Sequence, residues 1–421
     1  MGGTLSFRAP WPVTAVDPHR LDDAGAMFFG RALFDTLFTL DPNGAVVPSL
    51  AETLPEPCPE GVRISLREGL RFHHAGPVSP RDVLQSIERV RAKDGRGWLE
   101  PLGTLRIGPA GTLIASTRSP ERAARLLASP LTAVVPQRFV PEEPDGTGPF
   151  AVPRPRAAGI LVLSRNATAA SGPAFLDRVT VASAPDLAAS LRAFESGEDD
   201  LGWLGLGLHE PRRGSVSFDA GVVGVAILRT GSLGQRWDAP GVAQRLADGV
   251  DPSALAHLGV LPEWSVDPSD GWGGSPSSLL VRDDSPWLLE LARAVAAALS
   301  RPDHELTVRP LPPKDFADAR TSRSFALAVD VVRPFDGTPF GASCALTSAD
   351  DLSRGVELAR HPPLGTPPPL RSATRLLRVG VLASIHVSGG HLPDLTLPVL
   401  SPNAGTGLDF ASINRPAPRV R

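Results

Sequence analysis

The histidines are the side chains of this sequence most suited to acid–base or metal chemistry, and none of them stands in a catalytic pattern. His73 and His74 are adjacent, but no third ligand follows at zinc spacing and no H-E-x-x-H pattern occurs. His386 and His391 flank a pair of glycines, yet no Gly-x-Ser-x-Gly elbow supplies a nucleophile. The spacing therefore predicts no catalytic residue and no metal site.

The glycines and cysteines argue against further classes of site. Gly202, Gly205 and Gly207 have neither dinucleotide-binding spacing nor a helix start behind them, and no Gly-Lys-Ser/Thr phosphate loop occurs. Cys58 and Cys344 are the only two cysteines, too few and too far apart for a disulfide framework or a metal cluster. We expect two unpaired thiols and no cofactor.

Composition bounds the size and the partners of the protein. A chain of 421 residues with 42% hydrophobic residues can form two or three structural units. The net charge of −3 gives no electrostatic reason to expect a nucleic acid or an anionic membrane surface as partner. The longest apolar stretch, Gly221 to Leu228, has the length of a strand rather than of a membrane span, and the first residues show no secretory signal.

Short strands alternate with well-capped helices along the chain. Val62, Ile64 and Leu66 alternate with polar residues, as in a strand with one wet face. Ser79-Pro80-Arg81-Asp82 predicts a helix start with a capping box, and residues 237–250 and 286–299 have helical apolar spacing. The pattern predicts an α/β protein.

Three segments, in this order, resemble the extracellular solute-binding proteins of family 5, which serve dipeptide, oligopeptide and nickel ABC importers. The first is Leu33 to Phe38 followed by Val47-Pro48-Ser49-Leu50-Ala51-Glu52. The second is the strand at 62–66, the turn Arg67 to His73 and the helix from Ser79. The third is Gly146 to Phe150, followed by residues 175–179 and 194–200. Together they extend over residues 28–204.

The resemblance implies a fold and a division of the chain. The fold is an α/β, two-lobed, periplasmic-binding-protein-like fold of class II, with mixed sheets flanked by helices and a ligand cleft between the lobes. The larger lobe would comprise residues 1–225 and be completed by 383–421. The smaller lobe, 226–382, would be inserted between them.

The resemblance also points to ligand-binding residues near the end of the inserted lobe. Asp336 lies where family members place an acidic ligand contact, and a carboxylate there could pair with a peptide amino group; the alternative is a loop aspartate that stabilises a turn before Gly337. Arg333 could hold a ligand carboxylate through its planar fork, or be simply solvated. Phe340 ends the segment that resembles the ligand side of the family.

Two tryptophans and one loop complete the predicted site. Trp203 follows Gly202, so a ligand could approach the backbone there, although a core indole is the alternative. Trp11 falls where the family opens its cleft, or belongs to an apolar rim. Gly146 to Phe150 forms either a structural loop or a loop that offers main-chain N–H groups to a ligand.

The function implied by the resemblance is capture of a peptide or related small solute by lobe closure, without catalysis. The expected partners are that ligand and the membrane permease subunits of an ABC importer, with a monomeric protein in the periplasm or otherwise outside the cytoplasm and no nucleic acid. The alternative is a ligand sensor, or a degenerate binding module, derived from the same family.

Overall fold

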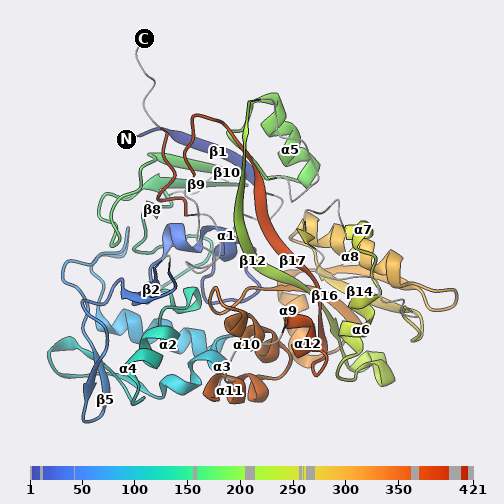
Figure 1. The fold of residues 1–421 in the computed structure, drawn as a ribbon, viewed down its shortest axis with the longest axis horizontal. Coiled ribbons are helices and arrows are strands. Elements are labelled where there is room, and N and C mark those ends of the chain that lie inside the picture. Colours follow the sequence, from blue (N-terminus) through green and yellow to red (C-terminus); the bar gives the residue numbers. More distant parts are fainter. Residues whose placement is uncertain are drawn as a thin grey trace.

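The computed structural model describes residues 2–9, 13–41, 43–154, 159–203, 214–255, 258, 260–261, 271–361, 369–397 and 409–415. Two lobes are joined by two long antiparallel strands, β12 (Val216–Thr230) and β17 (Val379–His391), which run side by side from one lobe into the other (Figure 1). We name the lobes by the predicted division, with residues 1–225 and 383–421 as the larger lobe and residues 226–382 as the smaller lobe. The structure therefore confirms the two-lobed α/β fold predicted from the sequence.

One mixed sheet continues through both lobes, in the order β15-β14-β16-β12-β17-β11-β1-β10-β9-β8, with β13 pairing β17. The larger lobe contributes β1 (Thr4–Ala9), β8 (Phe150–Ala151), β9 (Ile160–Arg165), β10 (Arg178–Ser183) and β11 (Leu201–Trp203). The smaller lobe contributes β13 (Val260–Leu261), β14 (Ser277–Arg282), β15 (Leu306–Leu311) and β16 (Leu327–Val332). The two crossing strands occupy the middle of this order.

The larger lobe also holds two smaller antiparallel sheets at its far end. One has the order β4-β5-β7-β6 and the other pairs β2 with β3. Their strands are β2 (Phe38–Leu40), β3 (Val46–Pro48), β4 (Glu56–Cys58), β5 (Gly61–Ile64), β6 (Leu105–Ile107) and β7 (Leu113–Ala115).

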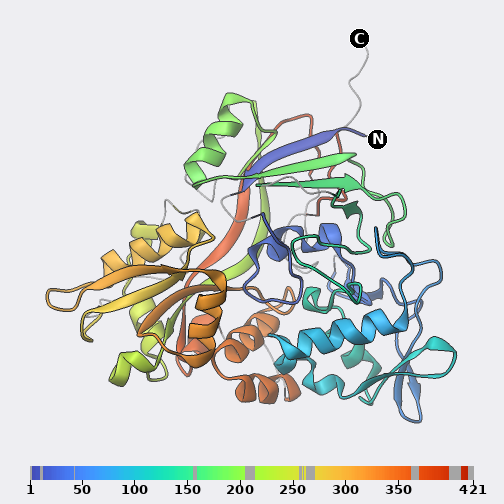
Figure 2. The same ribbon diagram turned by 180° about the vertical axis from the view of Figure 1, so that it is seen from behind.

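Helices flank the sheets of both lobes, as the view from behind also shows (Figure 2). Those of the larger lobe are α1 (Ala24–Leu33), α2 (Pro80–Ala92), α3 (Arg96–Leu99), α4 (Pro120–Leu126) and α5 (Leu187–Ser196). Those of the smaller lobe are α6 (Val242–Asp248), α7 (Pro252–Leu255), α8 (Pro286–Leu299), α9 (Pro313–Ser322), α10 (Pro339–Asp350), α11 (Leu352–Arg360) and α12 (Leu370–Thr374). Helices α10 and α11 lie against α3, so the two lobes meet there.

Local sequence signals explain where several of these elements begin. Helix α2 starts with the predicted capping box, in which the Asp82 carboxylate accepts the backbone N–H of Ser79 at 2.8 Å. Helix α8 covers the predicted 286–299. The single helix predicted over 237–250 is wrong at its start, because Pro240 and the left-handed Gly241 interrupt it and α6 begins at Val242.

The crossing strands are where the predicted lobe boundaries fall. In the β12–β17 ladder Val225 pairs with Ser384 and Ala226 with Ala383, so the boundaries at 225/226 and 382/383 lie at neighbouring rungs. The division itself stays a prediction. Among the residues described, no helix combines the length and the apolar character needed to cross a membrane.

Candidate functional site

A loop of the larger lobe, residues 13–23, reaches into the seam between the lobes. It ends at Asp23, whose carboxylate accepts the Ala26 N–H at 2.7 Å and so caps α1. Two contacts fix the loop from opposite sides: the backbone N–H of Leu21 donates to Asp94 of the larger lobe at 3.0 Å, and that of Arg333 of the smaller lobe donates to the Leu21 carbonyl at 2.9 Å. The loop thus touches both lobes.

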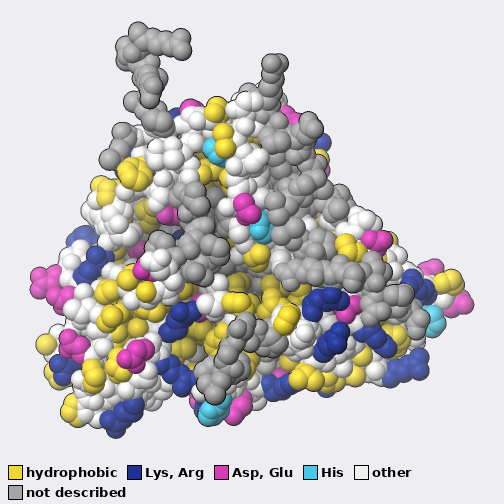
Figure 3. All heavy atoms as spheres, viewed as in Figure 1, with side chains coloured by type: hydrophobic (Ala, Val, Ile, Leu, Met, Phe, Trp, Pro, Cys, Tyr) yellow, Lys and Arg dark blue, Asp and Glu magenta, His cyan; other side chains and the backbone are white. Residues whose placement is uncertain are grey.

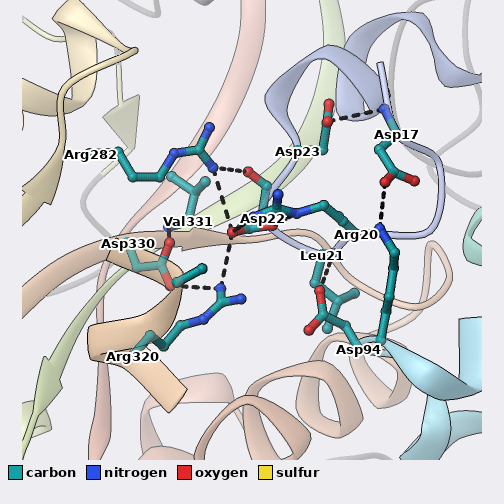
Figure 4. A network of polar contacts seen from close by, with 12 residues as sticks. Asp17, Arg20, Leu21, Asp22, Asp23, Asp94, Arg282, Arg320, Asp330 and Val331 are labelled. Carbon is teal, nitrogen blue, oxygen red and sulfur yellow. Dashed lines mark hydrogen bonds and ion pairs between the residues drawn. The ribbon is translucent and has the colours of Figure 1, made fainter. Parts of the chain in front are cut away.

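Asp22 is the centre of a buried ion-pair network in this seam (Figure 4). Its side chain is 1% exposed and accepts a two-pronged contact from Arg20, with Nε at 2.9 Å and Nη2 at 2.8 Å. The smaller lobe adds Arg320, whose Nη1 lies 3.0 Å from Oδ2, and Arg282, whose Nη1 lies 3.5 Å from the same oxygen and donates to the Asp22 carbonyl at 2.9 Å. One carboxylate therefore links the two lobes.

The network continues to the crossing strand β12. Asp330, in the middle of β16, is fully buried and accepts Nε of Arg229 at 3.0 Å, while Nη1 of Arg320 approaches it at 3.5 Å. Nη1 of Arg229 donates to the carbonyl of Ala349 near the end of α10, at 2.8 Å. Charges on β12, β16 and α9 are therefore coupled to the loop of the larger lobe.

Burial and charge pairing act in opposite directions on the aspartates of the loop. Burial by itself would raise the pKa of Asp22, but Arg320 and Arg20 outweigh it and hold that pKa well below its usual range. Burial raises the pKa of neighbouring Asp23 to about 6, although the N–H groups of Ala26 and Asp17 donate to its carboxylate and act to lower that pKa. Two adjacent carboxyl groups thus differ in pKa because charge pairing outweighs burial at the first, whereas burial dominates at the second.

An aromatic contact closes the seam on the other side. Trp98 in α3 is 2% exposed and stacks on Phe335, with 5.1 Å between ring centroids, and its indole N–H donates to the Leu126 carbonyl at 3.0 Å. The ring of Phe340 lies 6.2 Å from the Trp98 ring, tilted by 46°. The Ser129 hydroxyl donates to the Phe335 carbonyl. This contact joins α3 and α10 by apolar burial.

Beside the ionic network lies a cavity of about 360 Å³, which we call the seam cavity. The larger lobe lines it with Leu21, Asp22, Lys93 and Asp94, and the crossing strands with Arg229, Thr230 and Val379. The smaller lobe lines it with residues of α9, β16 and α10. A volume of this size is in the range of small-molecule sites.

Two predicted site residues serve to hold the lobes together. Arg333 is 5% exposed and donates to the Pro18 carbonyl, and burial lowers its pKa to about 10. Asp336 is 4% exposed, lies 3.0 Å from Nε of Arg125 in α4 and accepts the Thr338 N–H at 3.0 Å. Arg333 is not solvated, and Asp336 stabilises its own turn while pairing across the seam. Their contact with a ligand stays a prediction.

The other predicted site residues do not converge with these. Phe340 is half-buried against Trp98. Trp203 ends β11, where its backbone pairs with Gly389, and its side chain lies outside the described residues, as does Trp11. In the predicted loop, the Gly148 N–H donates to the Leu33 carbonyl at 3.0 Å, so that group already has a partner.

The sequence reasoning missed the charged residues of the seam, among them Asp22, Arg282, Arg320 and Asp330. A signal was present for one of them, because Asp330 interrupts the apolar strand Leu327–Val332, and a charge in such a strand is almost always paired. Asp22 carried no such signal, since it lies in a polar loop.

Neither thiol nor metal chemistry is supported by the described residues. Cys58 and Cys344 are both unpaired, as expected, and burial raises the pKa of the Cys344 thiol to about 12, which keeps it protonated and unreactive. Among the residues that the structure describes, no three His, Cys, Asp or Glu side chains are placed to hold a metal ion.

The two-lobed fold is shared with solved structures over nearly the whole chain. DppA of Helicobacter pylori, in complex with the peptide STSA, superposes with a TM-score of 0.74 at 17% identity, covering 98% of each chain. NikA of Staphylococcus aureus, in complex with Ni(L-His)2, gives 0.70 at 15% identity, covering 98% of this chain and 100% of its own. The agropinic acid complex of AgaA from A. tumefaciens R10 gives 0.69 at 16%, covering 99% of each.

Sequence comparison matches part of the chain to a family. Residues 45–208 match the profile of the bacterial extracellular solute-binding proteins, family 5 (middle segment). The uncharacterized protein YhjP of Bacillus subtilis (strain 168) is 28% identical over 178 residues, which are 41% of this chain and 31% of that protein, so the match spans about a third of the relative's length. The profile match over this segment and the shared fold agree with the resemblance to family 5 that the sequence motifs indicate.

Proposed function

We propose that the protein is the solute-binding component of a peptide-type ABC importer, and that it captures a small solute by closing its lobes around the seam cavity. The observation that supports this is the cavity itself, which is bounded by both lobes and by the strands that join them. A solute there touches both lobes at once and so favours the closed state by the contacts that it makes only in that state. No step of this function is catalytic.

The same proposal names location and partners. The protein would act outside the cytoplasmic membrane, as the family description states for its members. The permease subunits of the importer would recognise its closed form. A peptide or a related small solute is the proposed ligand, by analogy with the ligands of DppA and NikA.

A second candidate, a sensor or a degenerate binding module, is favoured by one specific observation. Arg333 and Asp336, the residues predicted to hold ligand charges, are engaged by Pro18 and Arg125 of the chain itself. A seam held by such contacts closes with little help from a solute.

Native mass spectrometry followed by small-angle scattering tests the proposal. We expect freshly purified protein to carry a solute, and removal of that solute by partial unfolding and refolding to increase the radius of gyration reversibly. Protein that carries no solute, and whose radius of gyration is unchanged by a dipeptide and tripeptide library, would favour the second candidate.

A further inference from the structure

The seam cavity has a wall on which positive charge is in excess. The basic side chains that line it are Lys93, Arg229, Arg320, Arg323 and Arg378. The acidic side chains that line it are Asp22, Asp94 and Asp350. A low-dielectric cavity with this balance favours a solute that brings negative charge.

Two of the basic residues, Arg323 and Arg378, share a single carboxylate. Nη2 of Arg323 contacts Oδ1 of Asp238, and Nε of Arg378 lies 3.4 Å from the same oxygen. That Nε is buried and makes no hydrogen bond to any described residue. The Thr230 hydroxyl, at 3.5 Å, also competes for this oxygen. One of the two guanidinium groups is therefore left with unused donor capacity beside the cavity.

Arg229 and Arg320, by contrast, already have carboxylate partners. Arg229 pairs with Asp330 at 3.0 Å, and Arg320 pairs with Asp22 at 3.0 Å. Lys93, the fifth basic residue, pairs with Asp17 at 2.7 Å. These three side chains build the wall, and the pair Arg323 and Arg378 is what remains for an anion.

The end of α10 supplies unused acceptors on the same cavity. Oγ of Ser348 and Oδ2 of Asp350 are buried and have no hydrogen-bond partner among the described residues. Asp350 is the last residue of α10, where the helix dipole disfavours a negative charge. Buried polar atoms are nearly always satisfied, so a small rotation of these two side chains into the cavity would give each the partner that it lacks, a donor of the solute.

We infer that the seam cavity binds a small organic acid that carries its own hydrogen-bond donor, such as a hydroxyl or amino group. The carboxylate would take the open donors of Arg323 and Arg378, and the donor group would take Asp350 and Ser348. This inference rests on the proposed function, because it names the class of solute around which the lobes close. The cavity of about 360 Å³ suits a compact solute better than an extended peptide.

Matched probes test the charge requirement on the full chain. L-Serine, L-lactate and L-alanyl-L-alanine are each compared with the corresponding amide, which keeps the shape and loses the carboxylate, by isothermal titration calorimetry. We expect at least one acid to bind about tenfold or more tightly than its amide, as the loss of a charged hydrogen bond implies. Equal binding of acid and amide, or no binding by any of the acids, would overturn the inference.

Substitutions assign the two ends of the solute. Arg378→Gln is expected to weaken the acid about tenfold and to leave the amide unchanged, whereas Arg375→Gln, on an exposed neighbouring arginine outside the cavity, is expected to change neither. Asp350→Asn should weaken L-serine more than propanoate, which lacks the donor. Arg323→Gln replaces Arg378→Gln should the latter fail to fold. The assignment would be contradicted if the Arg378→Gln protein bound the acid with the affinity of the unsubstituted chain.

The identity of any copurified solute separates this inference from the proposed function. A solute without a carboxylate that closes the lobes would refute the acid and leave the binding function standing. A protein that closes around no solute would refute both.

Discussion

The seam between the lobes has an ionic half and an aromatic half, and the two hold the lobes together by different physics. On the face drawn in Figure 3, charged and hydrophobic side chains are mixed over the lower half of the molecule, and the buried contacts of the seam are not seen. In the ionic half, the Asp22 carboxylate meets Arg320 and Arg282 of the smaller lobe. In the aromatic half, Trp98 stacks on Phe335.

The difference predicts how each half responds to conditions. A buried ion pair recovers its desolvation cost only while both charges are present, so protonation or removal of one partner leaves the other uncompensated. Stacked aromatic rings depend on buried area and not on pH. The ionic half is therefore the part of the seam that a solute or a proton can switch, and the aromatic half is the part that persists.

The largest effect is expected for Trp98→Ala. The change removes a buried indole and its stacking on Phe335 and leaves a cavity, so the free energy of unfolding should fall by about 3–5 kcal/mol. Urea denaturation measures the loss. Small-angle scattering should show a larger radius of gyration, because the lost contact crosses the seam and the two lobes can then move apart.

Trp287→Ala is the matched control for that change. Trp287 is 1% exposed, and its indole N–H donates to the Leu258 carbonyl at 2.9 Å, as the Trp98 indole does to Leu126. Trp287 and Leu258, however, both belong to the smaller lobe. We expect a similar loss of stability with an unchanged radius of gyration. An equal increase in the radius of gyration of the two variants would show that the aromatic contact does not hold the lobes together.

Asp22→Asn is expected to act more selectively and cost about 3 kcal/mol. The amide keeps the shape of the side chain and removes its charge, so Arg320 and Arg282 lose the carboxylate that neutralises them. Scattering should report a larger radius of gyration at neutral pH. Asp330→Asn, at an equally buried carboxylate of the smaller lobe, should lower stability while the lobes stay closed; if both variants opened alike, Asp22 would have no special role.

The pH dependence should show the two neighbouring aspartates acting with opposite sign. The pKa of Asp22 is lowered by folding, so its contribution to stability is complete above the ordinary value of 3.8 and is lost as the pH falls below it. The pKa of Asp23 is raised to about 6, so folding is favoured by protonation and that contribution is lost as the pH rises from about 4 to 6.

The measurement is the free energy of unfolding between pH 4 and 7 in the unsubstituted chain and in Asp23→Asn. We expect the unsubstituted chain to lose about 1–2 kcal/mol relative to Asp23→Asn as the pH rises from 4 to 6, because buried His19, whose pKa is lowered to about 3, contributes equally to both proteins. The same pH dependence in both proteins would assign the effect to another group.

The sequence was sufficient for the fold because its evidence was local. The capping box at Ser79 and Asp82 and the apolar spacing of 286–299 depend on neighbours within a few residues, and both helices are found where expected. The helix over 237–250 failed because Gly241 takes a left-handed conformation that apolar spacing does not reveal.

The site was harder to predict because it depends on pairs far apart in the chain. Asp22 and Arg320 are separated by 298 residues, and the sequence around either residue does not indicate that the other is its partner. Arg333 and Asp336 were found by resemblance, but the resemblance could not show that Pro18 and Arg125 occupy them. Lone charges in apolar strands, such as Asp330, are the signal that would have indicated the ionic half.

The smallest effect is expected where an ion pair crosses the same seam at its exposed rim. Glu100 and Arg360 lie 2.8 Å apart, as close as Arg20 and Asp22, yet their side chains are 36% and 48% exposed. Water and salt screen such a pair, so Glu100→Gln should cost less than about 0.5 kcal/mol, with no residual effect at 1 M salt. Urea denaturation at low and high salt measures this difference. A loss comparable with that of Asp22→Asn would mean that distance, and not burial, decides which charges hold the lobes together.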